Sequence, residues 1–461
     1  MGPSPAQSPL DGIRAVADVV YEPGYVSSFL PRLDLGWVEA VDGTEGFTVE
    51  LHDAADPSSP PLHGETQRTD RFIFREVVAG RRLSDLVVRI RATLTPPVDG
   101  EYAFGVNCSG AGTLRIDGKE VLSLGKEHEL DWSHLFRPDD RGSGRVELAG
   151  GKPVPFEFEY RMTPGPRGEI GLVTLRAQAP EPDNLAQRAV DAARAADVAV
   201  VVTGLGEEHE CEGYDRTSLE LPREQRDLIA AAAAANPRTV VVLSAGAPVL
   251  LDWADQVPAV LLVWYAGQEL GPALGEVLTG QAEPGGRLPM TFPARPEHAA
   301  VLDPAPDEGD RWNYREGLFI GYRHFDRAEL EPAYCFGHGL GYTSFEYEEL
   351  QVEPTGTSVD VTVRVRNRGE RRGGEVVQLY VSAEDPTRPR RELRAFQRIE
   401  LEAGAEGEVT LTLGERAFSG WDTDTERFEL LPGRHEIAVG SSSRDLRLTE
   451  SITFAEEAAA R

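Results

Sequence analysis

The sequence has only three cysteines in 461 residues, Cys108, Cys211 and Cys335, and they lie far apart. This spacing excludes a disulfide framework and the paired cysteines of a structural zinc site, and it favours a reducing compartment. No apolar run reaches the roughly 18 to 20 residues of a membrane-spanning helix, and the first residues lack the basic start and apolar core of a signal peptide. We therefore expect a cytoplasmic chain with no membrane partner.

Basic residues are also scarce, with 47 lysines and arginines against 77 aspartates and glutamates, which gives a net charge of -30. Such a chain repels the phosphates of nucleic acids and of anionic lipids, so we expect no nucleic-acid partner and favour a neutral or cationic ligand. A chain of 461 residues is too long for one hydrophobic core. About three domains are the expectation for this length.

Helical periodicity is nearly absent between residues 18 and 182. Alternating apolar residues over 87–94, 101–106 and 154–160 predict short strands, and Asp117-Gly118 is typical of a hairpin turn. This segment is expected to form an all-β sandwich or barrel. In the polar stretch after the turn, Trp132 and Phe136 are candidate substrate-binding residues because an aromatic ring can stack on the ring of a ligand, and packing into the core is an equal alternative.

Helix and strand patterns alternate from residue 183 to residue 345. Residues 184–196 and 222–235 predict helices, while the valines of 198–202 predict a strand that is covered on both faces. Further buried strands over 240–243 and 259–263 favour a doubly wound parallel sheet. Period-two patterns return from 346 to 455 and predict a seven-stranded immunoglobulin-like or fibronectin type III-like sandwich with a structural role.

The loop after the strand at 198–202 is crowded with acids. It contains Glu207, Glu208, His209, Glu210, Cys211, Glu212 and Asp215. Ligands of open α/β sheets bind beyond the carboxyl ends of the strands, so this loop is the expected site of chemistry. Carboxylates spaced so closely either face water or raise one another's pKa values for acid/base work.

Two other kinds of site are poorly matched by this loop. A dinucleotide site needs a third glycine after Gly204 and Gly206, and an anionic loop repels a pyrophosphate. A metal site at His209, Glu210 and Cys211 would use adjacent residues, whose side chains do not share a face. We therefore expect neither a metal nor an organic cofactor.

Three blocks of sequence carry a resemblance to a known family. They are Glu212-Gly213-Tyr214-Asp215-Arg216, the segment 264–293 (WYAGQELGPALGEVLTGQAEPGGRLPMTFP), and 314–326 (YREGLFIGYRHFD) followed by 335–347 (CFGHGLGYTSFEY). In this order they resemble the C-terminal α/β sandwich domain of glycoside hydrolase family 3, the family of many β-glucosidases. The segment 99–122 (DGEYAFGVNCSGAGTLRIDGKEVL) further resembles the protective-antigen-type β-domain that is inserted in one branch of that family.

The resemblance implies a multidomain protein in which an all-β protective-antigen-type domain is inserted into an α/β sandwich domain. A fibronectin type III-like β-sandwich follows. The expected boundaries are 1–17 for a remnant of the α/β sandwich domain, 18–182 for the inserted domain, 183–345 for the α/β sandwich domain and 346–455 for the last sandwich.

The resemblance also implies a function, the retaining hydrolysis of a terminal β-linked glucoside or oligosaccharide. In that branch the glutamate directly before Gly-Tyr-Asp-Arg is the general acid/base, which is Glu212 here, with Glu210 as the alternative. Such a group donates a proton to the leaving oxygen and then acts as a base on water. His209 stands where the family usually has a tryptophan, so the wall of the sugar site is expected to differ.

Other residues of the three blocks are expected to be structural. Asp215 and Arg216 are expected to form an ion pair that fixes the loop, and the segment 337–341 a tight turn. The residues expected to join the α/β domain to the last sandwich are Tyr314, Glu316, Tyr322 and Arg323.

One essential group has no counterpart in these residues. A retaining glycosidase needs a nucleophilic carboxylate at about 5 to 5.5 Å from the acid/base. In the family it comes from an N-terminal (β/α)8 barrel, and this chain resembles the C-terminal half of a β-glucosidase. Three hypotheses stay open: a separately encoded barrel completes the enzyme, the chain is a non-catalytic carbohydrate-binding or interaction fragment, or one of its own acids replaces the nucleophile.

Overall fold

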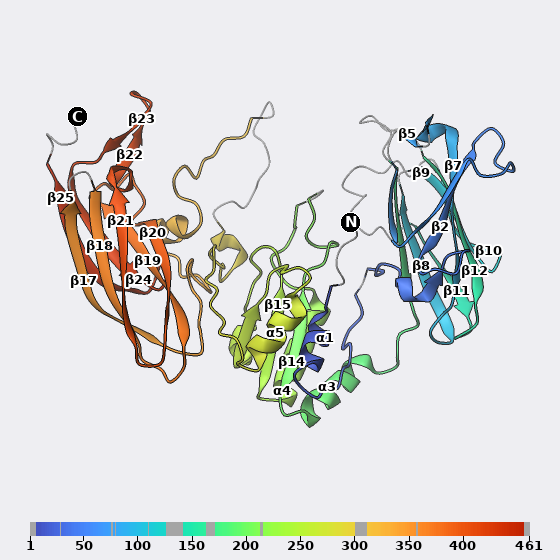
Figure 1. Ribbon diagram of the computed structural model, residues 1–461, viewed down its shortest axis with the longest axis horizontal. Helices are drawn as coiled ribbons and strands as arrows, with labels where there is room; N and C mark the ends of the chain where they lie inside the picture. The colour runs from blue at the N-terminus through green and yellow to red at the C-terminus, as the bar shows by residue number, and fades with distance from the viewer. Residues whose placement is uncertain are drawn as a thin grey trace. The chain divides into compact units, whose positions relative to one another are not determined.

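The computed structural model describes most of the chain (Figure 1), namely residues 6–27, 29–74, 77–78, 80–108, 110–125, 142–162, 171–212, 215–299, 311–355 and 358–455. By its internal packing the chain divides into two compact units. One consists of Met1–Val20, Ser218–Leu221 and Val240–Arg461, and the other of Tyr21–Thr217 and Pro222–Thr239. Among the described helices, none is long and apolar enough to cross a membrane.

The second unit contains an all-β domain built from two sheets. Its strands are β1 (Val38–Glu39), β2 (Phe47–Asp53), β3 (His63–Gln67), β4 (Arg71–Phe74), β5 (Val77–Val78), β6 (Arg81–Arg82), β7 (Leu86–Leu94), β8 (Gly100–Cys108), β9 (Gly110–Ile116), β10 (Lys119–Leu124), β11 (Ser143–Leu148), β12 (Val154–Met162) and β13 (Gly171–Gln178). One sheet has the order β10-β9-β12-β7-β2-β3, with β1 beside β7, and the other has the order β11-β8-β13-β4. Strands β5 and β6 pair only with each other among the described residues.

The alternation predicted from the sequence places the core of this domain. In β12, Phe156, Phe158 and Tyr160 are buried between the sheets, while the glutamates between them point outward. Asp117 and Gly118 form the two-residue hairpin between β9 and β10, and both have positive φ, 52° and 74°. A twisted two-residue hairpin requires this backbone, which explains the Asp-Gly pair.

Helices α3 (Leu185–Ala195) and α4 (Arg223–Ala235) pack against each other in the same unit, and α4 also packs on strand β14 (Ala199–Gly204). Asn236 ends α4, and its side-chain amide donates to the carbonyls of Ala193 and Ala196 at 2.8 and 2.9 Å. The side chain thereby satisfies carbonyls at the end of α3 that have no partner within that helix.

The prediction that β14 is covered on both faces is wrong. Burial alternates along the strand: Ala199, Val201 and Thr203 are buried, whereas Val202 is 41% exposed. Within the described part of the chain, cover is complete on one face only. A run of valines predicts a strand but does not show how many faces have a partner.

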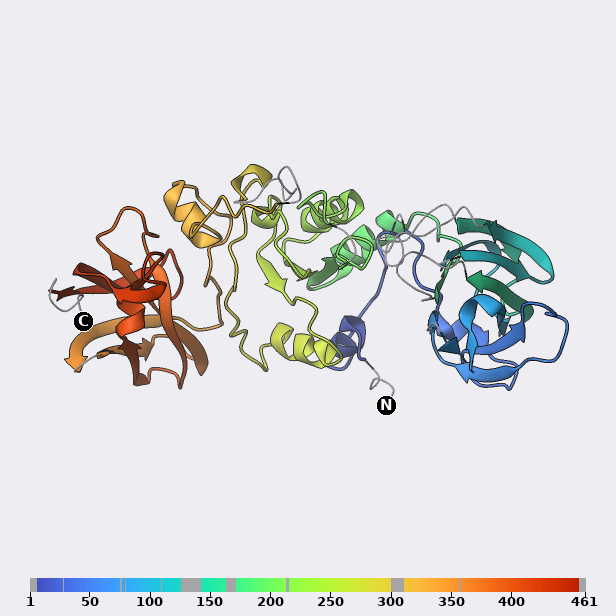
Figure 2. The ribbon, with the colours of Figure 1, turned by 90° about the horizontal axis from the view of Figure 1, so that it is seen from above.

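The first unit contains the rest of the α/β domain: α1 (Pro9–Arg14), β15 (Thr239–Ser244), β16 (Ala259–Leu262), α5 (Leu270–Leu278) and α6 (Tyr322–Arg327). Strands β15 and β16 are parallel, as predicted, with Val240 opposite Ala259. Helices α1 and α5 lie side by side in Figure 2 and touch at glycines. A Cβ on Gly12 would lie 1.8 Å from the carbonyl oxygen of Gly271, so the two backbones are in direct contact.

The last sandwich has seven strands in sheets of three and four in the described residues, as the period-two pattern predicts, and a separate two-stranded ribbon. The orders are β17-β18-β21, β20-β19-β24-β25 and β22-β23. The bounds are β17 (Phe345–Thr355), β18 (Ser358–Asn367), β19 (Gly373–Ala383), β20 (Glu392–Leu401), β21 (Glu406–Gly414), β22 (Ser419–Asp422), β23 (Arg427–Leu430), β24 (Gly433–Gly440) and β25 (Leu446–Phe454). Alternate residues of β18, from Val359 to Val365, point into its core.

The third sequence block joins the α/β domain to this sandwich. The backbone N–H of Leu393 donates to the hydroxyl of Tyr322 at 2.9 Å, and Arg323 lies 3.5 Å from Glu392. Gly337 has φ of +83°, and its carbonyl accepts a hydrogen bond from the buried side chain of Gln378 at 3.1 Å. These contacts bear out the structural roles expected for Tyr322, Arg323 and the turn at 337–341.

Tyr314 does not fit the same role. Its side chain is 88% exposed, while Glu316 is half-buried. A surface aromatic ring contributes nothing to a junction between domains, so the expectation for Tyr314 is wrong.

Candidate active site

The acid loop leaves β14 at a backbone position that is held by one side chain, Gln225 in the first turn of α4. The side-chain oxygen of Gln225 accepts hydrogen bonds from the hydroxyl of Thr203 and from the N–H of Gly204, the latter at 3.1 Å. Its amide donates to the carbonyl of Gly204 at 2.8 Å. Gly204 has φ of +155°, a backbone conformation in which a residue with a side chain is strained. The side chain of Gln225 hydrogen-bonds to both backbone polar groups of Gly204.

Glu207 is held by two arginines of the all-β domain. Arg71 Nη2, in β4, donates to Glu207 Oε2 at 2.5 Å, and Arg176 Nη2, in β13, donates to Glu207 Oε1 at 3.2 Å. Burial lowers the pKa of Arg176 and the neighbouring Glu207 opposes that shift. The carboxylate therefore compensates a buried positive charge.

Glu208 and His209 form the next contact of the loop. His209 Nδ1 lies 3.4 Å from Glu208 Oε1, and this contact is the main reason why the pKa of Glu208 is held below its usual range. The imidazole meets the ring of Phe29 edge-on, with 5.8 Å between the ring centroids. His209 thus packs against the segment that precedes β1.

Glu210 pairs with Arg216, whose Nη1 donates to Glu210 Oε1 at 2.8 Å, and both side chains are largely buried. The predicted ion pair between Asp215 and Arg216 is therefore corrected: the arginine reaches back six residues, and Asp215 is exposed. An ion pair between partly buried groups is worth more than one with a side chain in water, which explains the choice.

Glu212 stands apart from these pairs. It is exposed, and no hydrogen bond or ion pair to it is found among the described residues. The expectation of a cluster of repelling carboxylates is therefore corrected, because Glu207, Glu208 and Glu210 each have a cationic or imidazole partner. Of the two candidates for the acid/base, Glu210 is engaged by Arg216 and Glu212 is accessible to a ligand.

Two candidate residues cannot be placed. Trp132 and Phe136 lie outside the described residues, as do Gly213 and Tyr214 directly after Glu212. Within the described ranges, no group of three His, Cys, Asp or Glu side chains is arranged to hold a metal ion.

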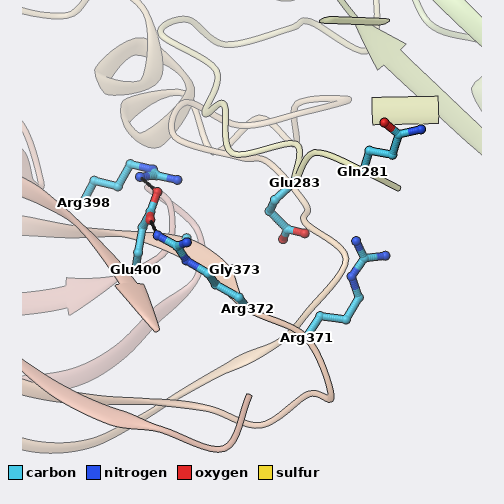
Figure 3. A pocket seen from close by; sticks show the side chains of 8 residues that line it. Gln281, Glu283, Arg371, Arg372, Gly373, Arg398 and Glu400 are labelled. Carbon is cyan, nitrogen blue, oxygen red and sulfur yellow. Dashed lines mark hydrogen bonds and ion pairs between the residues drawn. The ribbon is translucent and has the colours of Figure 1, made fainter. Parts of the chain in front are cut away.

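A polar pocket of about 410 Å³ lies in the other unit, where the α/β domain meets the last sandwich (Figure 3). Glu400 binds both Arg372 and Arg398 on its wall, and Glu283 accepts a hydrogen bond from the backbone of Tyr342 at 2.8 Å. Among the described residues that line this pocket there is none of the loop acids and no aromatic ring on which a sugar could stack. Its described lining carries three arginines and two glutamates, and Arg371 also donates to the backbone carbonyl of Gly280, so we assign the pocket to the junction between the domains.

Two family models match this chain. The family described as "Glycosyl hydrolase family 3 C-terminal domain" matches residues 2–342, and "Fibronectin type III-like domain" matches residues 375–443. A beta-glucosidase of Rhizobium radiobacter is 36% identical over 459 residues, which cover 96% of this chain and 55% of that protein. Thermostable beta-glucosidase B of Acetivibrio thermocellus is 42% identical over 345 residues, which cover 72% of this chain and 45% of that protein.

A solved structure agrees with these matches. The beta-glucosidase from Kluyveromyces marxianus, crystallised in complex with glucose, superposes with a TM-score of 0.88 at 25% identity, over 98% of this chain and 56% of that one. The chain thus spans about half the length of the curated relatives that it matches.

Proposed function

The chain belongs to glycosyl hydrolase family 3, and from that premise we propose that it supplies the proton-donating half of a β-glucosidase, which hydrolyses terminal β-linked glucosides with retention. The family match and the α/β domain followed by a fibronectin type III-like sandwich confirm the resemblance found in the sequence. The relatives are named beta-glucosidases, and the Kluyveromyces marxianus structure is a complex with glucose.

The state of the acid loop is the observation that carries the proposal. Glu207, Glu208 and Glu210 hold the loop in place through their partners, and Glu212 is exposed and has no partner among the residues that the structure describes. In the proposed reaction Glu212 protonates the glycosidic oxygen as the bond to the sugar breaks. It then takes a proton from the water that releases the sugar from the nucleophile.

We propose that the nucleophile comes from a (β/α)8 barrel outside these 461 residues. The chain spans about half the length of its relatives, and the acids next to Glu212 are engaged in pairs, which argues against a nucleophile from this loop. The segment 312–320 exposes four large apolar side chains, on Trp312, Tyr314, Leu318 and Ile320. Apolar side chains gathered on one exposed segment indicate a surface that a partner domain covers.

The alternative function is a carbohydrate-binding or interaction fragment without turnover. It is favoured if the surface at 312–320 binds a partner while no nucleophile reaches Glu212. Exposed aromatic rings such as those of Trp312 and Tyr314 suit both protein and sugar partners.

Hydrolysis of an aryl β-glucoside tests the two functions against each other. The purified chain is assayed alone and together with the barrel part of a family relative, and light scattering verifies that the mixture associates. Activity that requires the barrel and is lost in Glu212→Gln, while Glu210→Gln retains part of it, would establish the proposal. A mixture that associates but releases no product would leave the binding fragment as the better account.

A further inference from the structure

We propose that Glu207 is a positioning residue through which the all-β domain sets the place of Glu212. The catalytic consequence of this proposal rests on the proposed function, whereas the structural link can be tested on the chain alone. Three features carry it: two arginines on adjacent strands, an immobilised guanidinium and a closed turn between Glu207 and Glu212.

The two arginines present a fixed receptor for one carboxylate. Strands β4 and β13 are antiparallel neighbours, with Arg71 directly opposite Thr174. Arg176 lies two residues beyond Thr174, so its side chain is on the same face of the sheet as that of Thr174. Glu207 bridges the pair with one oxygen for each guanidinium, at 2.5 and 3.2 Å.

Arg176 is held in place by contacts within the all-β domain, so it cannot move together with the loop. It is buried, its Nε donates to the side chain of Asn107 at 3.1 Å, and its Nη1 donates to the carbonyl of Leu30 at 2.9 Å. A buried guanidinium without a counter-charge is strongly unfavourable, so Glu207 is held where Arg176 stands. The all-β domain therefore fixes this end of the loop.

The backbone turn around Glu207 links the position of Glu207 to that of Glu212. The backbone N–H groups of His209 and Glu210 both donate to the carbonyl of Gly206, at 2.9 and 3.0 Å. His209 also packs on Phe29, which precedes β1, the first strand of the all-β domain. Glu212 lies two residues after this closed turn, so a shift at Glu207 changes where its carboxyl group stands.

Opening of the loop can be measured on the chain alone, without a barrel domain, because Cys211 is next to Glu212 in the sequence and its side chain is half-buried. Its alkylation by iodoacetamide, measured by mass spectrometry of the peptide that contains it, reports how often the loop opens. Cys108 is buried and Cys335 lies within hydrogen-bonding distance of Ser442, so the same digest contains two internal references.

The variants are Glu207→Gln and Arg71→Gln. Arg71 is partly exposed, so we expect Arg71→Gln to leave the fold of the domain intact, even if Glu207→Gln destabilises it by removing the counter-charge of the buried Arg176. The matched control is Arg89→Gln. Arg89 pairs with Glu159 at 3.2 Å in the other sheet, with exposures of 26% and 28% that resemble the 23% and 31% of Arg71 and Glu207.

We expect alkylation of Cys211 to become about tenfold faster in both variants, because each loses charge-assisted hydrogen bonds that close the loop, and to stay unchanged in Arg89→Gln. Equal rates in all four proteins would overturn the proposal. A rise in Arg89→Gln as large as in the others would do so too, because it would show general loosening of the domain.

The catalytic consequence has its own signature in the complex with the barrel. Misplacing the acid lowers kcat/KM for a phenyl glucoside, whose leaving group needs a proton, and spares a dinitrophenyl glucoside, whose leaving group does not. An equal fall for both substrates would contradict a positioning role for Glu207. If no protein is active with either substrate while the alkylation rates differ as expected, the proposed function fails and the structural link stands.

Discussion

Replacing Gln225 by leucine tests whether one side chain holds the start of the acid loop. Leucine keeps the helix and most of the volume, but it removes the acceptor of the Thr203 hydroxyl and both partners of the Gly204 backbone. An unpaired buried polar group costs about 1 to 3 kcal/mol, and Gly204 is only half-buried, so we expect a local loss of about 2 to 3 kcal/mol.

Hydrogen exchange of the peptide that spans β14 and the loop is the appropriate assay, because a chain of two compact units has no single free energy of unfolding. The expected loss corresponds to exchange that is roughly 30 to 150 times faster in that peptide. Gln187→Leu is the control, since Gln187 is an exposed glutamine on α3. Protection that changes less than about threefold, or equally in both variants, would refute the role of Gln225.

Two further predictions concern the first unit. Gly12→Ala should weaken the packing of α1 on α5, because a Cβ there would lie 1.8 Å from the Gly271 oxygen and overpacking costs about 1 to 3 kcal/mol or more. Tryptic cleavage at the end of α1 should then become much faster. His435 is buried between Phe418 and Phe454, and burial lowers its pKa. The unfolded chain then binds the proton more readily than the folded chain does. The contribution of His435 to the stability of the sandwich is therefore complete above about pH 6.5 and is lost as the pH falls. His435→Leu should remove this pH dependence from the urea unfolding of the sandwich.

Each of these predictions has a control in the same chain. Gly286→Ala should leave proteolysis unchanged, because a Cβ there would meet no atom within 4 Å. His63 is half-exposed, so His63→Gln should leave the pH dependence of the sandwich unchanged. Tryptic cleavage of Gly12→Ala that is as slow as that of the original chain would contradict the packing described for α1. A pH dependence of urea unfolding that persists in His435→Leu would contradict the role assigned to His435.

The sequence predicted what depends on neighbouring residues. The hairpin at Asp117-Gly118 follows from backbone conformation alone, and the alternation of β12 and β18 follows from the period of a strand. The acid loop was located by the glycines that end β14 and by the rule that sites lie beyond the carboxyl ends of strands.

What the sequence did not predict depends on residues that are far apart. Arg71 lies 136 residues before Glu207, and Arg176 lies 31 residues before it, so nothing near the loop indicated its anchors. Gln225 gave no signal either, because a glutamine in the first turn of a helix is usually solvated. The ion pair expected between adjacent residues was wrong because Arg216 folds back onto Glu210.

The most direct test of Glu212 as the acid/base is azide rescue of Glu212→Ala in the complex with a barrel. The variant should lose roughly a hundredfold or more of its activity on a phenyl glucoside and retain kcat/KM on a dinitrophenyl glucoside. Azide should then restore turnover of the dinitrophenyl glucoside and yield β-glucosyl azide, because this substrate still forms the glycosyl-enzyme intermediate and azide attacks that intermediate without a general base. A variant that keeps full activity on the phenyl glucoside, or that azide does not rescue, would contradict the role assigned to Glu212.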